Sequence, residues 1–460
     1  MEGYQRKDKK MKNSTKNTMY YSLGFMSQNI IWYMINTYLM LFYTDVVSLS
    51  AGAISMIMLI ARVWDAVNDP MMGAIIDKTK TRWGKFRPYI IIAPPFLAIF
   101  NILTFTVWPV NGTAKAVLCG ISYIFAGMAY TAVGVAINGI VNRLSTDSTE
   151  KMKMISAANV ASNILQTILA AIAMPMILFF GKSDSVNGKG FLWTTVVFAL
   201  VSIPLFWLCG FKCREVEIAE PPKADKKGSL KKELGTVVKN RQLLIAITTV
   251  FVGAMAAIAR MSLLSYYVIY VVGSYTMISA VFTTLTVCQI IGTATLPWGT
   301  KKFGKKGYMI ILIVINAVTD LILFFNQSPT ITFVIAVSVI GGFSQGGGAI
   351  SYGMMCDCID YGDDRFGVRN EGIASSLMSF SVKLASAITG SVSIFLLTAT
   401  GYVAGAQQSP SALTGINIIV NLVPAILQLV GLLPLIWYKL DAKKMDEIAA
   451  SLQKRNSRLE

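Results

Sequence analysis

Ala61-Arg-Val-Trp-Asp-Ala-Val-Asn-Asp-Pro70 is a charged stretch inside an apolar block at about 50–76. On a helix, offsets of three, four and seven residues place Arg62, Asp65 and Asp69 along one face. Charges in the middle of a bilayer cost roughly 2.5–3.5 kcal/mol each, so a chain keeps them where they line an ion or substrate path. Carboxylate and amide oxygens, here including Asn68, are hard ligands that suit an alkali cation or a proton. The stretch therefore predicts a membrane transporter with a cation path.

The composition of the whole chain also indicates a membrane protein. Of its 460 residues, 54% are hydrophobic and only 14% are charged, which leaves too little polar surface for a soluble protein of this size. A membrane span takes about 20 apolar residues. Twelve blocks meet this length, at about 19–44, 50–76, 88–108, 114–143, 152–180, 191–209, 242–272, 276–298, 307–326, 330–356, 371–399 and 414–438. The sequence predicts an all-α membrane protein with twelve transmembrane helices.

Basic residues are unevenly distributed between alternate loops. With the N-terminus in the cytoplasm, cytoplasmic segments hold 35 of the 41 Lys and Arg residues, and the outer loops hold three. This positive-inside bias predicts that both termini are cytoplasmic, in a bacterial-type cytoplasmic (inner) membrane. Orientation signals and contact with anionic membrane lipid account for the net charge of +17, so we expect no nucleic-acid partner.

A charged segment divides the blocks six and six. We predict an N-terminal six-helix half at 1–209, a cytoplasmic linker at 210–241, a C-terminal six-helix half at 242–438 and a cytoplasmic tail at 439–460. Short Gly- and Lys-containing turns, Arg82–Tyr89 and Lys302–Tyr308, follow the second block of each half. Matched turns indicate an internal duplication, which is typical of transporters with a midplane site between two halves. The alternative is that Gly and Lys simply suit inner loops.

Lys383 lies inside the eleventh block on a stripe of serines that includes Ser379. Such a polar stripe faces an interior or a cavity rather than lipid, so Ser379 is a candidate substrate contact. A lysine at this depth needs a carboxylate, and Asp65 or Asp69 is the expected partner. A bound cation would neutralise the negative charge left over. The alternative is a static salt bridge that only sets packing.

Arg260 lies in the outer part of the seventh block. It either reaches the outer interface with its guanidinium or recognises an anionic group of the substrate. Asp320, in the ninth block, is a possible partner.

A charged cluster before the eleventh block predicts a cytoplasmic gate. Asp357, Asp360 and Arg369 belong to it, and we expect its acids to pair with the basic loop at 78–87. Weak, exposed salt bridges suit a gate that must open. Arg62 is assigned to the same gating group.

The residue types that the sequence lacks bear on other functions. The chain has no histidine, so a proton path would use carboxylates or tyrosines. Cys356-Asp-Cys358 has no second cysteine pair to complete a metal site. With no nucleophile motif, we expect neither an enzyme nor a cofactor. One alternative transport function is that of a carrier of amphiphilic anions such as lysolipids.

Several motifs resemble the glycoside–pentoside–hexuronide:cation symporter family. They are Tyr43-Thr-Asp-Val-Val47, Arg62–Gly73, Thr81–Pro88, Asp360-Tyr-Gly362 and Arg369–Ala374, followed by Lys383. The resemblance spans the full chain. It implies a major facilitator fold and uptake of a glycoside or sugar acid by alternating access, coupled to inward Na⁺, Li⁺ or H⁺ movement.

The resemblance also implies site residues, carried over one position at a time. The family's cation site falls on Asp65, Asn68, Asp69 and Thr131, which all match, and its coupling lysine falls on Lys383. The family's sugar-binding positions fall on Asn29, Tyr130, Gly134, Asn138 and Asn159, of which only Tyr130 keeps the family residue. Because two acidic sugar ligands are replaced and Arg260 is present, we expect a neutral or anionic substrate, such as an acidic glycoside.

Overall fold

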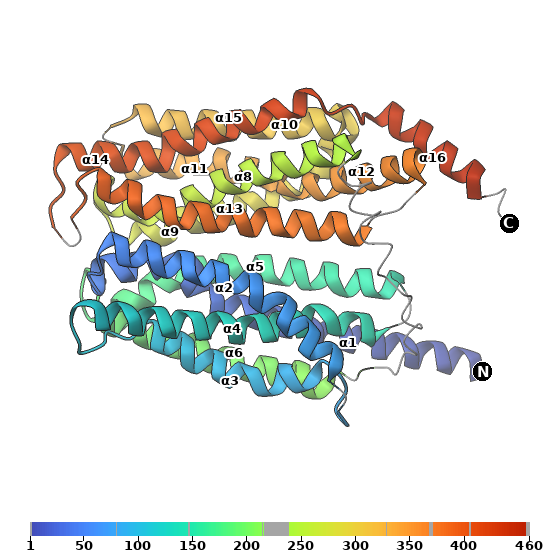
Figure 1. Cartoon of the computed structure of the whole chain (residues 1–460), viewed down its shortest axis with the longest axis horizontal. Coiled ribbons are helices and arrows are strands. Elements are labelled where there is room, and N and C mark those ends of the chain that lie inside the picture. The colour runs from blue at the N-terminus through green and yellow to red at the C-terminus, as the bar shows by residue number, and fades with distance from the viewer. Residues whose placement is uncertain are drawn as a thin grey trace. The chain divides into compact units, whose positions relative to one another are not determined.

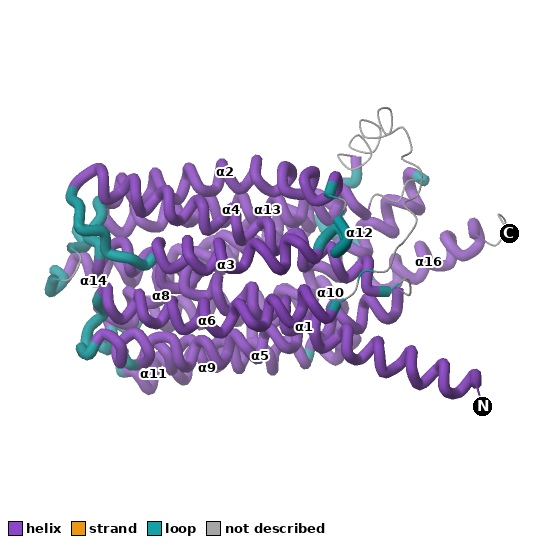
Figure 2. Tube along the Cα trace, turned by 90° about the horizontal axis from the view of Figure 1, so that it is seen from below, coloured by secondary structure: helices purple, strands orange, loops and turns teal. Residues whose placement is uncertain are grey.

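The structure is a computed structural model that describes residues 2–79, 81–145, 148–213, 215, 239–327, 329–367, 371–403 and 406–456. Within these ranges the chain is helical, and its only extended pairing is an isolated bridge between Thr81 and Gly84. Figure 2 shows long helices joined by short loops. The predicted all-α class is therefore confirmed for the part of the chain that the structure describes.

Helices of the first half of the chain come first in the fold. They are α1 (Glu2–Leu41), the π-helical turn η1 (Phe42–Val46), α2 (Ala51–Lys78), α3 (Arg87–Thr104), α4 (Gly112–Leu144), α5 (Ser148–Gly181) and α6 (Gly188–Lys212). α1 packs against α5 and α6, α3 packs against α4 and α6, and α2 packs against α4 (Figure 1). The rings of Phe42, Phe105 and Phe191 pack together in the core of this half.

Helices of the second half follow the same style of packing. They are α8 (Arg241–Tyr266), the π-helical turn η2 (Tyr267–Val271), α9 (Met277–Ala294), α10 (Leu296–Phe325), α11 (Ile331–Gln345), the 3₁₀ turn η3 (Gly346–Ala349), α12 (Ile350–Phe366), α13 (Glu371–Ala399), α14 (Pro410–Asn417), the π-helical turn η4 (Ile418–Leu422), α15 (Val423–Ile436) and α16 (Ala442–Asn456). α8 packs against α13 and α15, and α10 packs against α11 and α15. α10 is kinked at Gly304, whose φ of 70° favours glycine.

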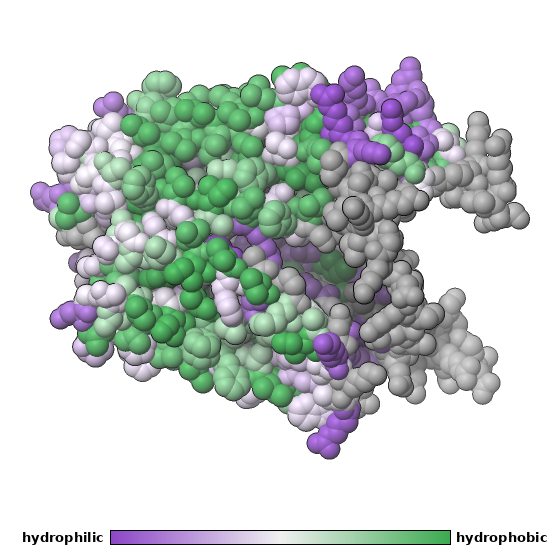
Figure 3. Space-filling view, in the orientation of Figure 1, coloured by the Kyte–Doolittle hydropathy of each residue, from purple (hydrophilic) through white to green (hydrophobic). Residues whose placement is uncertain are grey.

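Eleven helical stretches of the described residues are long and apolar enough to cross a membrane. α1 holds the first of the twelve predicted blocks but is not among the eleven, because amides such as Gln28, Asn29 and Asn36 lower its hydropathy. Large apolar side chains, including Phe179, Phe325 and Phe395, are exposed on these helices. On the face seen in Figure 3, hydrophobic residues cover much of each unit's helical surface, as expected for helices that face lipid.

The chain forms two compact units. The first comprises Met1–Ala219 with two short later segments, and the second comprises the remainder. Residues 216–238, which make up most of the predicted linker at 210–241, lie outside the described residues.

Both units end their first helix in the same way. η1 follows α1 and η2 follows α8, and each is five residues long. The residue two positions after each π-turn, Ser48 or Gly273, has a positive φ of 57° or 84°.

A second detail recurs at the next loop of each unit. The Thr79 and Tyr89 hydroxyls lie 2.6 Å apart in the first unit, and those of Thr295 and Tyr308 lie 2.9 Å apart in the second. The first pair links the end of α2 to the start of α3, and the second links the end of α9 to the part of α10 just after its kink at Gly304. Shared details of this kind are expected of an internal duplication.

The turn before α3 is held by a residue from the far end of its unit. Glu215 accepts hydrogen bonds from the backbone N–H groups of Lys85, Phe86 and Arg87 at 2.8–3.0 Å. These donors have no partner within the helix, and a carboxylate is stabilising at a helix N-terminus. Gly84 has a φ of 105°, and a Cβ there would collide with the Glu215 carboxylate.

Candidate functional site

Asp69 and Thr131 come from neighbouring helices of the first unit and are in direct contact. α2 carries Asp69, and α4, which packs against α2, carries Thr131. The Thr131 hydroxyl donates to Asp69 Oδ1 at 3.0 Å, and the threonine is buried. Because the hydroxyl donates this hydrogen bond, its oxygen lone pairs stay available to a positively charged ligand.

Asp65 lies one helical turn before Asp69 on α2. Its Oδ2 is 3.4 Å from Arg62 Nη1, and about a quarter of each side chain is exposed. Its Oδ1 lies against Gly127 of α4, where an added Cβ would be 3.4 Å away. The glycine therefore lets the carboxylate approach α4 closely. Arg62, which the sequence assigned to the gating group, contacts the predicted cation residue Asp65.

Asn68 is completely buried, with 0% of its surface exposed. Within the described residues neither its Oδ1 nor its Nδ2 has a hydrogen-bond partner. An unsatisfied buried polar group costs about 1–3 kcal/mol. No cluster of three or more His, Cys, Asp or Glu side chains occurs in the described part of the chain. The donor set of two carboxylates, one amide and one hydroxyl is instead chemically suited to a monovalent cation.

Tyr130 and Asn29 lie among polar and aromatic partners in the first unit. The Tyr130 ring stacks on Trp32, with centroids 4.0 Å apart and planes 21° apart. Asn29 Nδ2 donates to Ser162 Oγ at 3.2 Å, and Gln166 Nε2 donates to Asn29 Oδ1 at 3.4 Å. Asn29 is therefore directed toward α5.

Gln28 is a polar residue that the sequence analysis did not single out. Its Nε2 fills the space beside Gly134, where a Cβ would be only 2.7 Å away, and its side chain hydrogen-bonds Tyr130. The missed signal is the pairing of a helical Gln with a glycine on another helix. Asn138 and Asn159 are exposed, and Asn159 Nδ2 donates to the Ile155 carbonyl of its own helix. The structure does not join these two to the other residues.

Lys383 and Ser379 lie in the second unit, both exposed on α13. The expected pairing of Lys383 with Asp65 or Asp69 joins residues of different units and stays a prediction.

Arg260 lies in the interior of the second unit rather than at an interface. It is 2% exposed and forms an ion pair with Asp320 of α10, which is 0% exposed. Gln428 Nε2 of α15 donates to the other oxygen, Asp320 Oδ2, at 3.0 Å. The ion pair neutralises the guanidinium, so Arg260 contributes no net positive charge for an anionic substrate.

Asp357, a residue of the predicted gate, pairs with a lysine of its own unit. Lys305 Nζ lies 2.7 Å and 2.8 Å from the two Asp357 carboxylate oxygens. The corresponding turn of the second unit therefore supplies a lysine to Asp357. The expected pairing of Asp357 with the 78–87 loop joins residues of different units and stays a prediction. Asp360 is half-buried on α12, and Arg369 lies outside the described residues.

Known proteins similar to this chain are membrane transporters. The profile of the MFS/sugar transport protein family matches residues 20–442. The chain is 31% identical to the isoprimeverose transporter of Lactiplantibacillus pentosus, over 95% of the chain and 91% of that protein. It is 28% identical to the glucuronide carrier protein homolog of Escherichia coli K12, over 95% and 94%.

A solved structure shares the fold at low sequence identity. It is the crystal structure of a bacterial homologue of the human lysosomal transporter Spinster, in an inward-facing and unoccupied conformation. It superposes with a TM-score of 0.69 at 10% identity, and covers 95% of this chain and 98% of the other. The likeness shows that the helices of this chain have the fold of that transporter.

Proposed function

Because the chain belongs to the MFS/sugar transport protein family, whose glycoside–pentoside–hexuronide:cation symporters its motifs resemble, we propose that it couples inward cation movement to uptake of a glycoside. The chain is a multi-pass inner-membrane transporter with a major facilitator fold and not an enzyme. Relatives named for isoprimeverose and glucuronide transport support a glycoside substrate. None of the relatives reported above favours the alternative of amphiphilic anions.

The contact between Thr131 and Asp69, next to the unpartnered amide of Asn68, carries the proposal. Asp65 and Asp69 supply negative charge, and Asn68 and Thr131 supply neutral oxygens. A proton needs only a carboxylate, whereas Na⁺ gains from the neutral donors. The coupling ion is therefore Na⁺, with Li⁺ and H⁺ as the ions to compare.

Coupling follows from competition for the two acids. A cation that enters from outside sits between Asp65 and Asp69 and loosens their hold on Lys383, and the site then binds glycoside more tightly. This coupling free energy is reciprocal, so the glycoside also tightens cation binding. A membrane potential of 100 mV supplies about 2.3 kcal/mol per charge. At about 1.4 kcal/mol per tenfold change, one cation sustains roughly fifty-fold accumulation.

The proposed topology completes this picture. α1 crosses the membrane in addition to the eleven stretches described above, which brings the number of transmembrane helices to twelve. Its polar residues face a protein interior rather than lipid, and both termini are cytoplasmic. The concentration of basic residues in alternate loops supports this orientation. Asn29 and Tyr130 in the first unit contact the glycoside, and Asp360 and Arg369 act at the cytoplasmic gate.

Transport assays in proteoliposomes test the proposal. Asp65→Cys and Asp69→Cys should abolish uptake driven by an inward Na⁺ gradient while some glycoside exchange persists. Asp184→Asn, in an exposed loop, should leave both activities unchanged. Running the series with Na⁺, with Li⁺ and across pH identifies the ion. Full uphill accumulation by both Cys variants would refute the cation role.

A further inference from the structure

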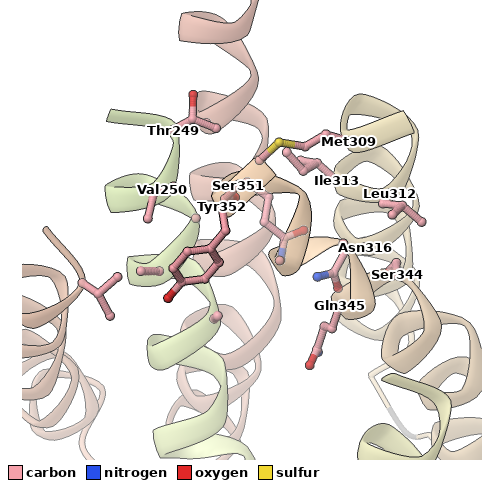
Figure 4. Close-up of a pocket in the computed structure, with 18 of the residues that line it drawn as sticks. Thr249, Val250, Met309, Leu312, Ile313, Asn316, Ser344, Gln345, Ser351 and Tyr352 are labelled. Carbon is pink, nitrogen blue, oxygen red and sulfur yellow. The ribbon is translucent and has the colours of Figure 1, made fainter. Parts of the chain in front are cut away.

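The second unit contains a cavity of about 400 Å³. It is bounded by α8, α9, α10, α11, the η3 turn, α12, α13 and α15 (Figure 4), and every lining residue belongs to this one unit. Its volume falls in the range of about 300–1,000 Å³ that is typical of small-molecule sites. The predicted substrate contacts of the first unit do not line it.

The cavity lining is mostly apolar, with a few polar side chains and no charged one. Four amides line it, Gln289, Asn316, Gln345 and Gln428, together with several hydroxyl side chains. No lining residue is acidic or basic. Figure 4 shows Asn316 and Gln345 among apolar neighbours such as Leu312. A few amides and hydroxyls on an apolar wall suit a neutral ligand that has both polar groups and a hydrocarbon face.

Gln428 has a defined orientation in this wall. It is 8% exposed, and its Nε2 donates to the Asp320 carboxylate. Only the NH₂ end of an amide can donate to a carboxylate, so the Oε1 end is free to accept. Within the described residues this buried Oε1 has no partner, and neither does Asn316 Oδ1. The wall of the cavity therefore holds two buried acceptors that lack donors. Both oxygens have almost no accessible surface, so ligand hydroxyl groups would reach them through a small movement of the amide side chains.

The ion pair behind the wall explains why Gln428 is held. Asp320 contacts Arg260 through one oxygen and Gln428 through the other. The Arg260 guanidinium is the counter-charge of the Asp320 carboxylate, and a charged acceptor makes a stronger hydrogen bond to the amide. In this arrangement Arg260 and Asp320 are positioning residues that act through Gln428.

We propose that this cavity is a subsite for an uncharged glycosyl unit, in which Gln428 Oε1 and Asn316 Oδ1 accept hydrogen bonds from sugar hydroxyls. The proposal rests on the proposed transport of a glycoside and adds that the part bound here is neutral. It assigns to the second unit a role in substrate recognition through residues that are not among the predicted substrate contacts.

Equilibrium binding to the purified full-length protein tests the subsite without requiring transport. The probes are 4-nitrophenyl glycosides of neutral hexoses and pentoses, their single-deoxy analogues, and the matching glucuronide. Gln428→Met should weaken binding of the best neutral glycoside roughly tenfold, because one hydrogen bond is lost. The variant should also bind one deoxy analogue with the same affinity as the parent sugar. A merely structural role for Gln428 would leave the preference for the parent sugar unchanged.

Two further variants make the result decisive. Asn316→Ala, on α10 rather than α15, should weaken binding by a similar factor and lose discrimination at another hydroxyl. Leu429→Ala, on the exposed side of α15, is the matched control and should bind as the wild type does. If Gln428→Met fails to fold, Asn316→Ala carries the test alone.

The contrary outcomes are distinct from failure of the proposed function. Wild-type binding constants for every glycoside in folded Gln428→Met and Asn316→Ala would overturn the subsite and leave only trapped water there. Tighter binding of the glucuronide than of all neutral glycosides, lost together with these amides, would overturn its neutrality. Glycoside binding that depends on both amides, in a protein without cation-driven uptake, would instead refute only the coupling.

Discussion

Replacing Thr131 by valine removes one hydroxyl group and keeps the shape of the side chain. The hydroxyl lies 3.0 Å from Asp69 Oδ1 in a buried position. A hydrogen bond to a charged group contributes about 1.5–3 kcal/mol, which corresponds to roughly 10–150-fold in an equilibrium constant. If the Thr131 oxygen also coordinates the cation, all of this loss falls on cation affinity. We expect Thr131→Val to raise the half-saturating Na⁺ concentration by at least about tenfold.

The assay is glycoside uptake into proteoliposomes at saturating glycoside, measured over a series of external Na⁺ concentrations. Thr131→Ser is the matched control because it keeps the hydroxyl and loses only a methyl group. Its half-saturating Na⁺ concentration should stay within about threefold of the wild-type value, which is less than one hydrogen bond to a charged group contributes.

Two results would refute the reasoning. An unchanged Na⁺ dependence in Thr131→Val would remove the hydroxyl from the cation site. Equal defects in the Val and Ser variants would show that packing, rather than the hydroxyl, is responsible.

Other contacts lead to separate predictions. Asp320→Asn should lower stability by about 3–5 kcal/mol, because it leaves the buried Arg260 guanidinium without a counter-charge; melting in detergent should show this, and removing both charges together should restore most of the loss. Glu215→Ala should cost about 0.5–2 kcal/mol through loss of the α3 cap and should speed trypsin cleavage in the turn before α3. Lys305→Ala should lower the free energy of unfolding by at most about 1 kcal/mol. Added salt should lower the melting temperature of the wild type more than that of the variant, because salt screens the ion pair with Asp357.

The helical fold and the charged face of α2 could be predicted from the sequence. Apolar blocks of spanning length identify helices directly, and helical periodicity places Asp65 and Asp69 on one face. The likeness to a symporter family brought Thr131 into the same group, and the structure puts its hydroxyl against Asp69. Amides in α1 lower the hydropathy of the first predicted block. Hydropathy alone does not distinguish a polar helix inside a bundle from a polar segment outside it.

Most partners across the fold could not be predicted. The sequence offered Asp320 as a possible partner of Arg260, and the structure shows this ion pair, but periodicity does not reveal that Gln428 lies beside Asp320. For the same reason the contact between Lys305 and Asp357 was not predicted. Contacts between helices depend on tertiary packing, and a single sequence records each residue's polarity but not its neighbour.

The buried pair of Arg260 and Asp320 has a consequence for biogenesis. The ribosome completes α8 before α10, so the arginine reaches the translocon two helices ahead of the acid that neutralises it. An isolated arginine at mid-bilayer costs about 2.5–3.5 kcal/mol during insertion. α8 must therefore either stay beside the translocon or enter lipid at a penalty that is relieved only when α10 arrives, so the order of synthesis sets when this charge is neutralised.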